Sequence, residues 1–197
     1  MFRYSVSHNN ITRNVLCGMI FTVCLFVLSC GKRNSTHNYD PTTSGSNTTT
    51  SNVSVVTVGS SGTILTSSDN GTSWTLRTSG NLDSFQGVTY GNGLFVTVGE
   101  TLLTSSDGIT WTSRTSGTTN RLLGVTYGNG LFVTVGYSGT ILTSSDGNSW
   151  TERDSGTSEY LKGVTYGNGL FVVVGEDGII FTSSDGNSWT ERTPGTS

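Results

Sequence analysis

The feature that most constrains the fold of this chain is an internal repeat marked by tryptophan. Four tryptophans follow one another at intervals of 37, 39 and 39 residues: Trp74, Trp111, Trp150 and Trp189. Around each of them the chain has nearly the same sequence, and the segment from Gly124 to Trp150 reappears with few changes from Gly163 to Trp189. Self-similarity at a fixed period near forty residues is the signature of a repeat protein.

Each repeat contains four short segments with the character of β-strands, separated by turn residues. In the third repeat we expect strands a to d at residues 124–127, 131–136, 140–145 and 149–153, with a tight hairpin at Tyr127-Gly-Asn-Gly130 between a and b. Strand b of the fourth repeat, Leu170–Val174, is apolar on both faces, so it should be covered on both sides. Four antiparallel strands with such cover predict one propeller blade. The predicted fold is therefore all-β, a propeller-like array of about four four-stranded blades.

Closure of the array is an open question at the level of the sequence. The first repeat begins at Val53 with strand b, so fifteen strands are visible where four complete blades need sixteen. The missing inner strand could come from Thr48 to Ser54. The four repeats could form a small closed ring, pair with a second copy of the chain as a homo-oligomer, or remain an incomplete array with exposed blade faces.

The N-terminus predicts export from the cytoplasm. Residues 15–28 form an apolar run of about fourteen residues, which suits a secretory signal and is shorter than the roughly twenty residues of a membrane-spanning helix. The end of this run, Val27-Leu-Ser-Cys-Gly31, resembles the lipobox of bacterial lipoproteins. The resemblance implies cleavage after Ser29 and a lipid on Cys30, with the chain anchored in the bacterial cell envelope, at the outer membrane or the cell surface. The alternative is an ordinary secreted protein cleaved nearby.

The predicted domain organisation has three parts: a signal peptide at 1–29, the lipidated Cys30 with a tether to residue 52, and the repeat domain at 53–197. The tether is rich in Ser, Thr and Asn and lacks apolar periodicity, so it cannot bury enough surface to fold. Cys17 and Cys24 lie in the signal, and His37 lies in the tether. The repeat domain therefore has neither a disulfide framework nor a cysteine or histidine metal site, and we expect no cofactor.

The turn between strands c and d carries the most specific local motif. Ser67-Ser-Asp-Asn-Gly-Thr-Ser-Trp74 resembles the Asp-box of sialidases, sortilin-type receptors and photosystem II assembly-factor propellers, and the later three repeats are one residue shorter. The resemblance implies a propeller. A carboxylate in such a turn can accept backbone N–H bonds, while the tryptophan packs over the hairpin. We therefore interpret these residues as structural: Asp69, Trp74, Asp107, Trp111, Asp146, Trp150, Asp185 and Trp189.

Sialidases belong to this group, so an enzyme must be considered. A sialidase needs converging arginines, a tyrosine nucleophile with a glutamate, and an acidic aspartate. The repeated arginines instead occupy one position on the predicted outermost strand: Arg77, Arg114, Arg153 and Arg192. We therefore predict no enzymatic activity. From residue 53 onward the chain has six basic and twelve acidic side chains, which disfavours nucleic acid as a partner.

The repeats differ from one another mainly in the d–a and b–c connections, which lie on the same side of an up-and-down blade array. Loops on a rigid scaffold commonly carry recognition. Seven residues of these connections are candidate binding residues: Asp83, Phe85, Arg121, Tyr137, Glu159, Tyr160 and Lys162. The alternative is that these loops vary because nothing constrains them.

The leading functional hypothesis is a lipid-anchored envelope protein that binds a protein or a glycan through this variable face. A second hypothesis is an envelope assembly factor, as resemblance to the photosystem assembly propellers suggests. A third is a degenerate sialidase-like glycosidase.

Overall fold

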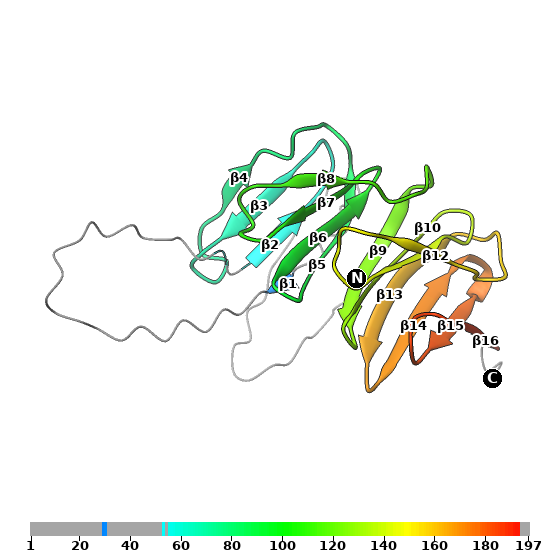
Figure 1. The fold of residues 1–197 in the computed structure, drawn as a ribbon. Coiled ribbons are helices and arrows are strands. Elements are labelled where there is room, and N and C mark those ends of the chain that lie inside the picture. The colour runs from blue at the N-terminus through cyan, green and yellow to red at the C-terminus, as the bar shows by residue number, and fades with distance from the viewer. Residues whose placement is uncertain (1–28, 31–52, 54, 194–197) are drawn as a thin grey trace, which may run out of the picture.

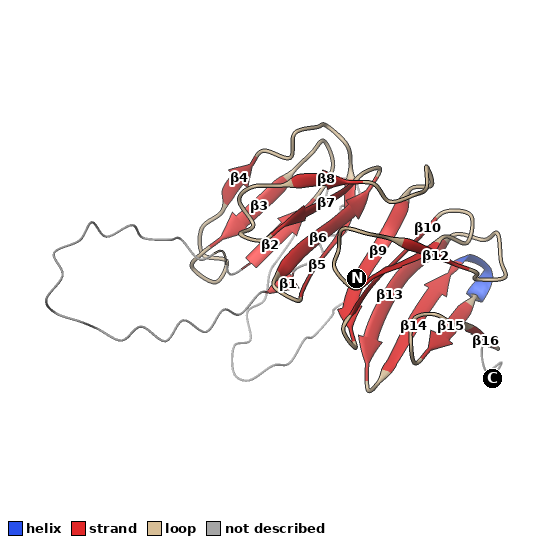
Figure 2. Ribbon diagram, viewed as in Figure 1, coloured by secondary structure: helices blue, strands red, loops and turns tan. Residues whose placement is uncertain are grey.

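The computed structural model describes residues 29–30, 53 and 55–193, and these form four four-stranded antiparallel sheets (Figure 1). The sheets are four consecutive blades, and within each the strands follow one another in chain order from the inner strand a to the outer strand d. Figure 2 shows that β-structure dominates the described residues, whose only helical element is the 3-10 turn Glu176–Gly178. The predicted all-β propeller architecture is confirmed.

The sixteen strands have the following bounds. Blade one contains β1 (Ser29–Cys30), β2 (Val55–Val58), β3 (Ile64–Ser67) and β4 (Thr75–Arg77). Blade two contains β5 (Phe85–Gly91), β6 (Leu94–Gly99), β7 (Leu102–Ser105) and β8 (Thr112–Arg114). Blade three contains β9 (Leu122–Gly128), β10 (Leu131–Gly136), β11 (Ile141–Ser144) and β12 (Thr151–Arg153). Blade four contains β13 (Leu161–Gly167), β14 (Leu170–Gly175), β15 (Ile180–Ser183) and β16 (Thr190–Arg192).

The a–b hairpins of blades two to four have the geometry that their sequence predicts. In blade three, Asn129 and Gly130 have φ angles of 49° and 76°, so both central residues of the two-residue turn lie in the left-handed region. This is the backbone of a type I′ turn, which matches the twist of the flanking strands. The turn therefore fixes the register of β9 against β10, in which Tyr127 lies opposite Phe132.

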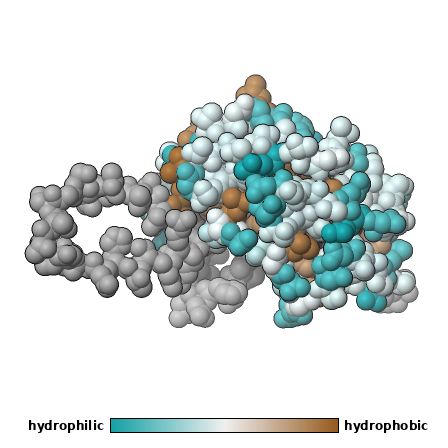
Figure 3. All heavy atoms as spheres, in the orientation of Figure 1, coloured by the Kyte–Doolittle hydropathy of each residue, from teal (hydrophilic) through white to brown (hydrophobic). Residues whose placement is uncertain are grey.

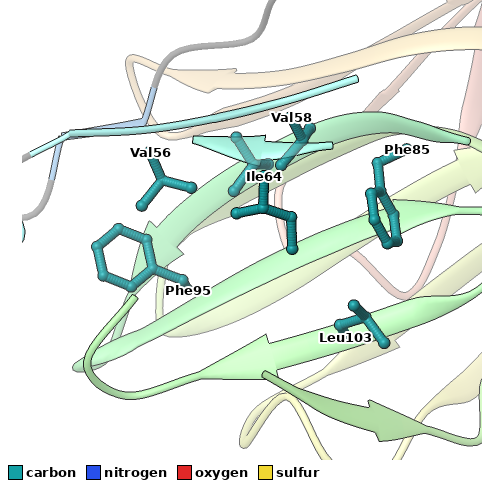
Figure 4. Packing of buried hydrophobic residues seen from close by; sticks show 7 residues of the cluster. Val56, Val58, Ile64, Phe85, Phe95 and Leu103 are labelled. Atoms are coloured by element: carbon teal, nitrogen blue, oxygen red, sulfur yellow. The ribbon is translucent and has the colours of Figure 1, made fainter. Parts of the chain in front are cut away.

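The blades pack face to face through alternating side chains of strands b and c. We call the face of a blade that contacts the next blade along the chain its leading face, and the opposite side its trailing face. Figure 4 shows the first such interface, in which Val56, Val58 and Ile64 of blade one lie against blade two. The partners on the trailing face of blade two are buried: Phe85, Phe95 and Leu103. Since a strand exposes alternate residues to opposite faces, strand b is apolar on both sides, as predicted.

Near the inner strands, a tyrosine of blade three and one of blade four each lie on a glycine of the blade before. A Cβ atom added at Gly91 would collide with the ring of Tyr127, and one added at Gly128 would collide with the ring of Tyr166. The same position in blade four, Gly167, has nothing within 4 Å of such an atom. Glycine is therefore required at the first two positions by the close approach of an aromatic ring rather than by backbone conformation.

The sixteenth strand, absent from the repeat pattern, is β1. Ser29 pairs with Val56 and Cys30 with Val55, which gives them the positions that Thr89 and Tyr90 occupy in blade two. The strand that completes blade one therefore contains Ser29 and Cys30, whereas the alternative segment from Thr48 to Ser54 lies almost entirely outside the described residues. Cleavage after Ser29 would remove half of β1.

The array is open rather than a closed ring. Inner strands contact each other in sequence, β1 with β5, β5 with β9 and β9 with β13, and Figure 1 shows the first and last blades at opposite ends. The small closed ring is therefore wrong for this chain, because its last blade has a leading face that no other blade covers. Val174 is 46% exposed there, whereas the equivalent Val135 of blade three is fully buried.

The outer surface is mixed in character. Figure 3 shows a surface that is largely hydrophilic or neutral in this view, interrupted by separate hydrophobic spots. In the part of the chain that the structure describes, no helix has the length and apolar character needed to cross a membrane. The predicted signal peptide and tether fall mostly on residues 1–28 and 31–52, which lie outside the described residues.

Candidate functional site

The variable connections of neighbouring blades lie against one another through backbone hydrogen bonds. Gly139, in the b–c turn of blade three, donates its N–H to the carbonyl of Glu159 in the following d–a connection at 2.8 Å. Gly62 donates in the same way to Asp83, also at 2.8 Å. The loops of blades one and three therefore share one backbone geometry despite different sequences, whereas the b–c turn of blade two is shorter.

Two tyrosines stack at the boundary between blades three and four. Tyr137 begins the b–c turn of blade three, and Tyr160 immediately precedes β13 of blade four. Their rings lie parallel within 5°, with centroids 4.2 Å apart. Parallel rings at this separation stabilise each other beyond the area that they bury. The stack brings together two candidate residues that are 23 positions apart in the sequence.

A cation lies beside the stack. The ammonium of Lys162 is 5.3 Å from the centre of the Tyr160 ring, within the range of a cation–π interaction. Its nitrogen is also 2.7 Å from a carboxylate oxygen of Glu176. The hydrogen bond with Glu176 raises the pKa of Lys162 above its ordinary value. Both charged groups are nearly half exposed, so this ion pair contributes little to folding and is available to a partner.

The equivalent positions one blade earlier carry an ion pair in place of the tyrosines. Arg121 precedes β9 as Tyr160 precedes β13, and Glu100 follows β6 as Tyr137 follows β10. An Nη2 atom of Arg121 lies 3.6 Å from a carboxylate oxygen of Glu100. The Nε atom of Arg121 is buried without a hydrogen-bond acceptor. The guanidinium therefore has donor capacity that the described residues leave unused.

These residues form a continuous row across blades two to four, which we call the variable row: Glu100, Arg121, Tyr137, Tyr160, Lys162 and Glu176. Four of the seven predicted binding residues belong to it. Glu100 and Glu176 were not among the candidates, although both occupy the repeat position of Tyr137. Comparing the repeats at that one position would have found them.

The other three candidate binding residues, Asp83, Phe85 and Glu159, lie outside the variable row. Phe85 is wrong as a binding residue: it is 2% exposed, begins β5 and packs in the core between blades one and two. Its repeat equivalents are the buried Leu122 and Leu161, so the position is part of the blade interface. Asp83 and Glu159 accept the loop hydrogen bonds through their main-chain carbonyls.

A shallow groove on blade one departs from the repeat in its side chains, whereas its location is repeated on blade two, where a groove of about 430 Å³ is lined in part by Glu100. The groove on blade one has a volume of about 560 Å³ and is lined in part by Leu76 and Leu82, which are 68% and 83% exposed. The other repeats have Ser or Glu at the first of these positions and Thr or Ser at the second. Arg77 is the one charged residue among the described residues that line this groove.

In each c–d turn the aspartate and a neighbouring serine are hydrogen-bonded within the turn itself. The Oδ1 atom of Asp146 accepts the N–H groups of Asn148 and Ser149 at 2.8 and 2.9 Å. In blade four the N–H groups of Ser188 and Asn187, with the hydroxyl of Ser183, lower the pKa of Asp185 to about 2. Such carboxylates have their acceptor capacity used inside the turn and stay ionised.

The tryptophans and repeated arginines also have architectural positions. The indole nitrogens of Trp111 and Trp150 donate to the carbonyls of Gly108 and Gly147, each at 3.1 Å. Trp74 is 40% exposed, so the first tryptophan covers its blade less completely than the others. On the outer strands, every repeated arginine donates from Nε to a threonine of strand c: Arg77, Arg114, Arg153 and Arg192. They do not converge on one centre.

Comparison with protein-family models identifies the family of this chain. The model of the DUF6242 beta propeller domain matches residues 33–161, well over half of the sequence. The chain belongs to this family. The DUF6242 match begins within the segment predicted to be a tether and ends at the start of blade four. A comparison with curated proteins gave no match.

Solved structures support the same fold. YCF48 from Cyanidioschyzon merolae is 20% identical with a TM-score of 0.59, and the alignment covers 73% of this chain and 53% of YCF48. A structure described as YCF48 bound to D1 peptide has the same identity and TM-score, covering 73% of this chain and 50% of that one. The computationally designed Ika8 protein is 12% identical with a TM-score of 0.57, covering 72% of this chain and 46% of its own. This DUF6242 chain thus spans about half the length of the propellers that it resembles.

Proposed function

We propose that this chain is a non-enzymatic binding scaffold that holds a peptide segment of a partner protein across its variable row. The observation that carries the proposal is the parallel stack of Tyr137 and Tyr160 with Lys162 beside it, next along the row to Arg121, whose carbonyl accepts the N–H of Tyr137. An aromatic surface with a flanking cation provides contact area together with a charge-assisted hydrogen-bond donor. A peptide with an apolar or aromatic side chain next to a carboxylate matches this chemistry.

The structural comparisons support this choice of partner class. One of the similar propellers is a YCF48 described as bound to D1 peptide, so a propeller of related architecture carries a peptide. In the present chain Arg121 has an ion pair of 3.6 Å and a buried Nε without an acceptor. A peptide carboxylate would pair with the accessible part of this guanidinium in place of Glu100, since exchange of one ion pair for another costs little at a partly exposed site.

The test is selection from a displayed peptide library against the full chain, followed by affinity measurements on the selected peptides. We expect enrichment of acidic residues beside aromatic ones. Arg121→Gln should weaken binding about ten-fold or more through the lost charge-assisted bonds, and Tyr160→Ala should also weaken it. Leu82→Ala, in the groove on blade one, is the matched control and should bind as the wild type does.

Two results would count against the proposal. One is that no peptide is enriched above background while a glycan array gives specific binding. The other is that the selected peptides lose as much affinity with Leu82→Ala as with Arg121→Gln, which would locate binding away from the variable row.

We further propose that the scaffold works in the bacterial cell envelope, attached through a lipid on Cys30, and an envelope assembly role is compatible with this location. The support is the lipobox-like sequence Val27–Gly31. Expression in a bacterium fed with labelled palmitate should label the wild type and not Cys30→Ala. Equal labelling of the two, or an intact mass that retains Ser29, would refute lipoprotein processing.

A further inference from the structure

Each blade has two ends, because its neighbouring strands are antiparallel and their connections alternate between the ends. The variable row lies at one end, and the a–b hairpins and c–d turns lie at the other, which we call the turn end. β1 reaches the turn end. Cys30 lies opposite Val55, and Val55 lies opposite Ser67, the last residue of β3 before the c–d turn of blade one. A lipid on Cys30 would therefore leave the domain at the turn end.

The place where the described chain resumes lies at the same end. Val53 packs against the c–d turn of blade two, since a Cβ atom added at Gly108 would lie 2.8 Å from its side chain. Val53 also joins the core cluster between blades one and two. The residues on either side of segment 31–52 are therefore both at the turn end, near blades one and two.

The tryptophan of blade one is partly in water because its aromatic partner is missing. In blade two the ring centroids of Trp111 and Phe95 are 6.4 Å apart. Val55 occupies the position of Phe95 in blade one, and Trp74 is 40% exposed. An indole combines an apolar body with an N–H donor, and such side chains are favoured at the boundary between water and a bilayer.

The c–d turn of blade two has a second exposed apolar side chain. Ile109 is 37% exposed, and its equivalents in the other turns are Thr72, Asn148 and Asn187. The main chain of this turn is held by Asp107, whose carboxylate accepts the N–H of Ile109 at 2.7 Å. Apolar departures from the repeat thus occur in the c–d turns of blades one and two, the blades next to the proposed anchor.

The charges of the turn end indicate which kind of surface it fits. The c–d turns and a–b hairpins contain no lysine or arginine. Asp69 accepts the N–H of Ser73 at 2.9 Å, and Asp107 accepts that of Thr110 at 2.8 Å, so these carboxylates are engaged within their own turns. A strongly anionic surface would repel them, whereas a surface of zwitterionic headgroups would not.

We propose that the turn end of blades one and two rests on the bilayer that holds the lipid on Cys30, with Trp74 and Ile109 at the level of the headgroups. The variable row then faces away from the membrane, toward its peptide partner. This inference rests on the lipid anchor proposed above and deepens the proposed function, because it assigns one end of the blades to the membrane and the other to the partner. Two side chains bind a bilayer weakly from solution, but the attached lipid keeps them close to the surface, so a weak contact selects the orientation.

The experiment uses the protein purified with its lipid from a bacterial host that expresses the full sequence. It is reconstituted into phosphatidylcholine vesicles that contain a photoactivatable phospholipid, and peptide mapping by mass spectrometry identifies the residues linked to lipid after irradiation. Links should form in the c–d turns of blades one and two and not in the variable row. Peptides that bind the variable row should have the same affinity for the protein on vesicles as for the protein in detergent.

Matched variants test the two side chains. Ile109→Asn gives the turn of blade two the residue found in blade three, and it should reduce lipid links in the neighbouring turn of blade one about three-fold. Trp74→Ser should likewise reduce the links in the turn of blade two. Leu82→Thr removes an exposed leucine from the opposite end and introduces the residue found in blade two, so it is the control and should leave the links unchanged. Circular dichroism of each variant checks that the fold is retained.

Three results would overturn the inference. Links as frequent in the variable row as in the c–d turns would mean that the lipidated protein has no preferred orientation, and a loss of peptide affinity on vesicles would mean that the variable row faces the bilayer. Equal effects of Ile109→Asn, Trp74→Ser and Leu82→Thr would remove the role of the two turn residues. An intact mass without lipid would instead refute the anchor and this inference together, whereas peptide binding in detergent tests the peptide-binding role separately.

Discussion

One position of strand b is threonine in blades one to three, and the hydrogen bonding of its hydroxyl differs among these blades. Thr97 and Thr134 donate their hydroxyls to the carbonyls of Gly87 and Gly124 in strand a, at 2.9 and 2.8 Å. Thr57 is buried, and its hydroxyl has no hydrogen-bond partner among the residues that the structure describes. Blade four has Val173 at this position. The hydroxyl is therefore useful only where a complete strand a provides its acceptor.

We predict that Thr57→Val stabilises the protein, whereas Thr97→Val destabilises it. The first change removes a buried unsatisfied hydroxyl and the second removes a satisfied one, each with an effect of about 1 kcal/mol on the free energy of unfolding. Urea denaturation followed by tryptophan fluorescence measures both. If both variants lose stability to the same extent, the difference in hydrogen bonding between Thr57 and Thr97 has no energetic consequence.

The carboxylates of the c–d turns predict a loss of stability in acid. The pKa of Asp146 is lowered by N–H groups of Ser149 and Asn148, and that of Asp185 is lowered to about 2. A carboxyl group with a lowered folded-state pKa contributes stability above its unfolded pKa of about 3.9, and this contribution is lost as the pH falls through the folded-state value. The melting temperature should therefore fall between pH 4 and about pH 2.

The double variant Asp146→Asn with Asp185→Asn should melt lower at pH 6 and should lose less on acidification than the wild type. Asp177→Asn, outside the c–d turns, is the control and should follow the wild-type pH profile. Identical pH profiles for all three proteins would mean that the turn carboxylates do not govern acid stability.

Among the elements, the inner strands provide a matched pair of glycines. Gly128→Ala should destabilise the protein by about 1–3 kcal/mol, because its methyl group must displace the ring of Tyr166. Gly167→Ala at the equivalent position of blade four meets open space and should be nearly neutral. Thermal unfolding of the two variants at a concentration well below that of any self-association decides the point, and equal destabilisation would contradict it.

The strands themselves were predictable from sequence to within about two residues, because the Tyr-Gly-Asn-Gly turns fix where strands a and b meet. In blade three the predicted strand b at 131–136 coincides with β10, and the predicted inner strand at 124–127 lies within β9. The part of the site that could be predicted was the location of Arg121, Tyr137, Tyr160 and Lys162 on one face. Their pairing across blade boundaries could not be predicted, since it depends on how far each blade is rotated against the next.

Two features show the limits of comparing repeats. Phe85 differs from its repeat equivalents, which suggests a variable loop, although leucine and phenylalanine are interchangeable in an apolar interface. The sequence leaves the inner strand of blade one open, and in the structure Ser29–Cys30 pairs with β2. Sequence comparison of repeats identifies differences but does not distinguish buried from exposed ones, and it gives no signal for a strand that is not a copy of its equivalents.

For the whole molecule, the open array predicts unequal protection of equal sequences. β10 and β14 share the pattern Leu-Phe-Val-x-Val-Gly, but β10 is covered on both faces and β14 on one. Hydrogen exchange followed by mass spectrometry, at high dilution, should show faster exchange in β14 than in β10. Equal protection in the two strands would mean that the leading face of blade four is covered within a single chain.

The contact between Tyr166 and Gly128 also has a consequence for how such a chain can grow. A repeat contains both residues of this contact: a tyrosine whose ring packs on the glycine of the preceding repeat, and a glycine on which the tyrosine of the following repeat packs. Gly167 is such a glycine, and nothing lies within 4 Å of a Cβ atom added there. Duplicating residues 155–193, one full period of 39 residues, would therefore add a fifth repeat whose tyrosine packs on Gly167, without compensating substitutions. Length in this architecture can change by whole units through a single genetic duplication.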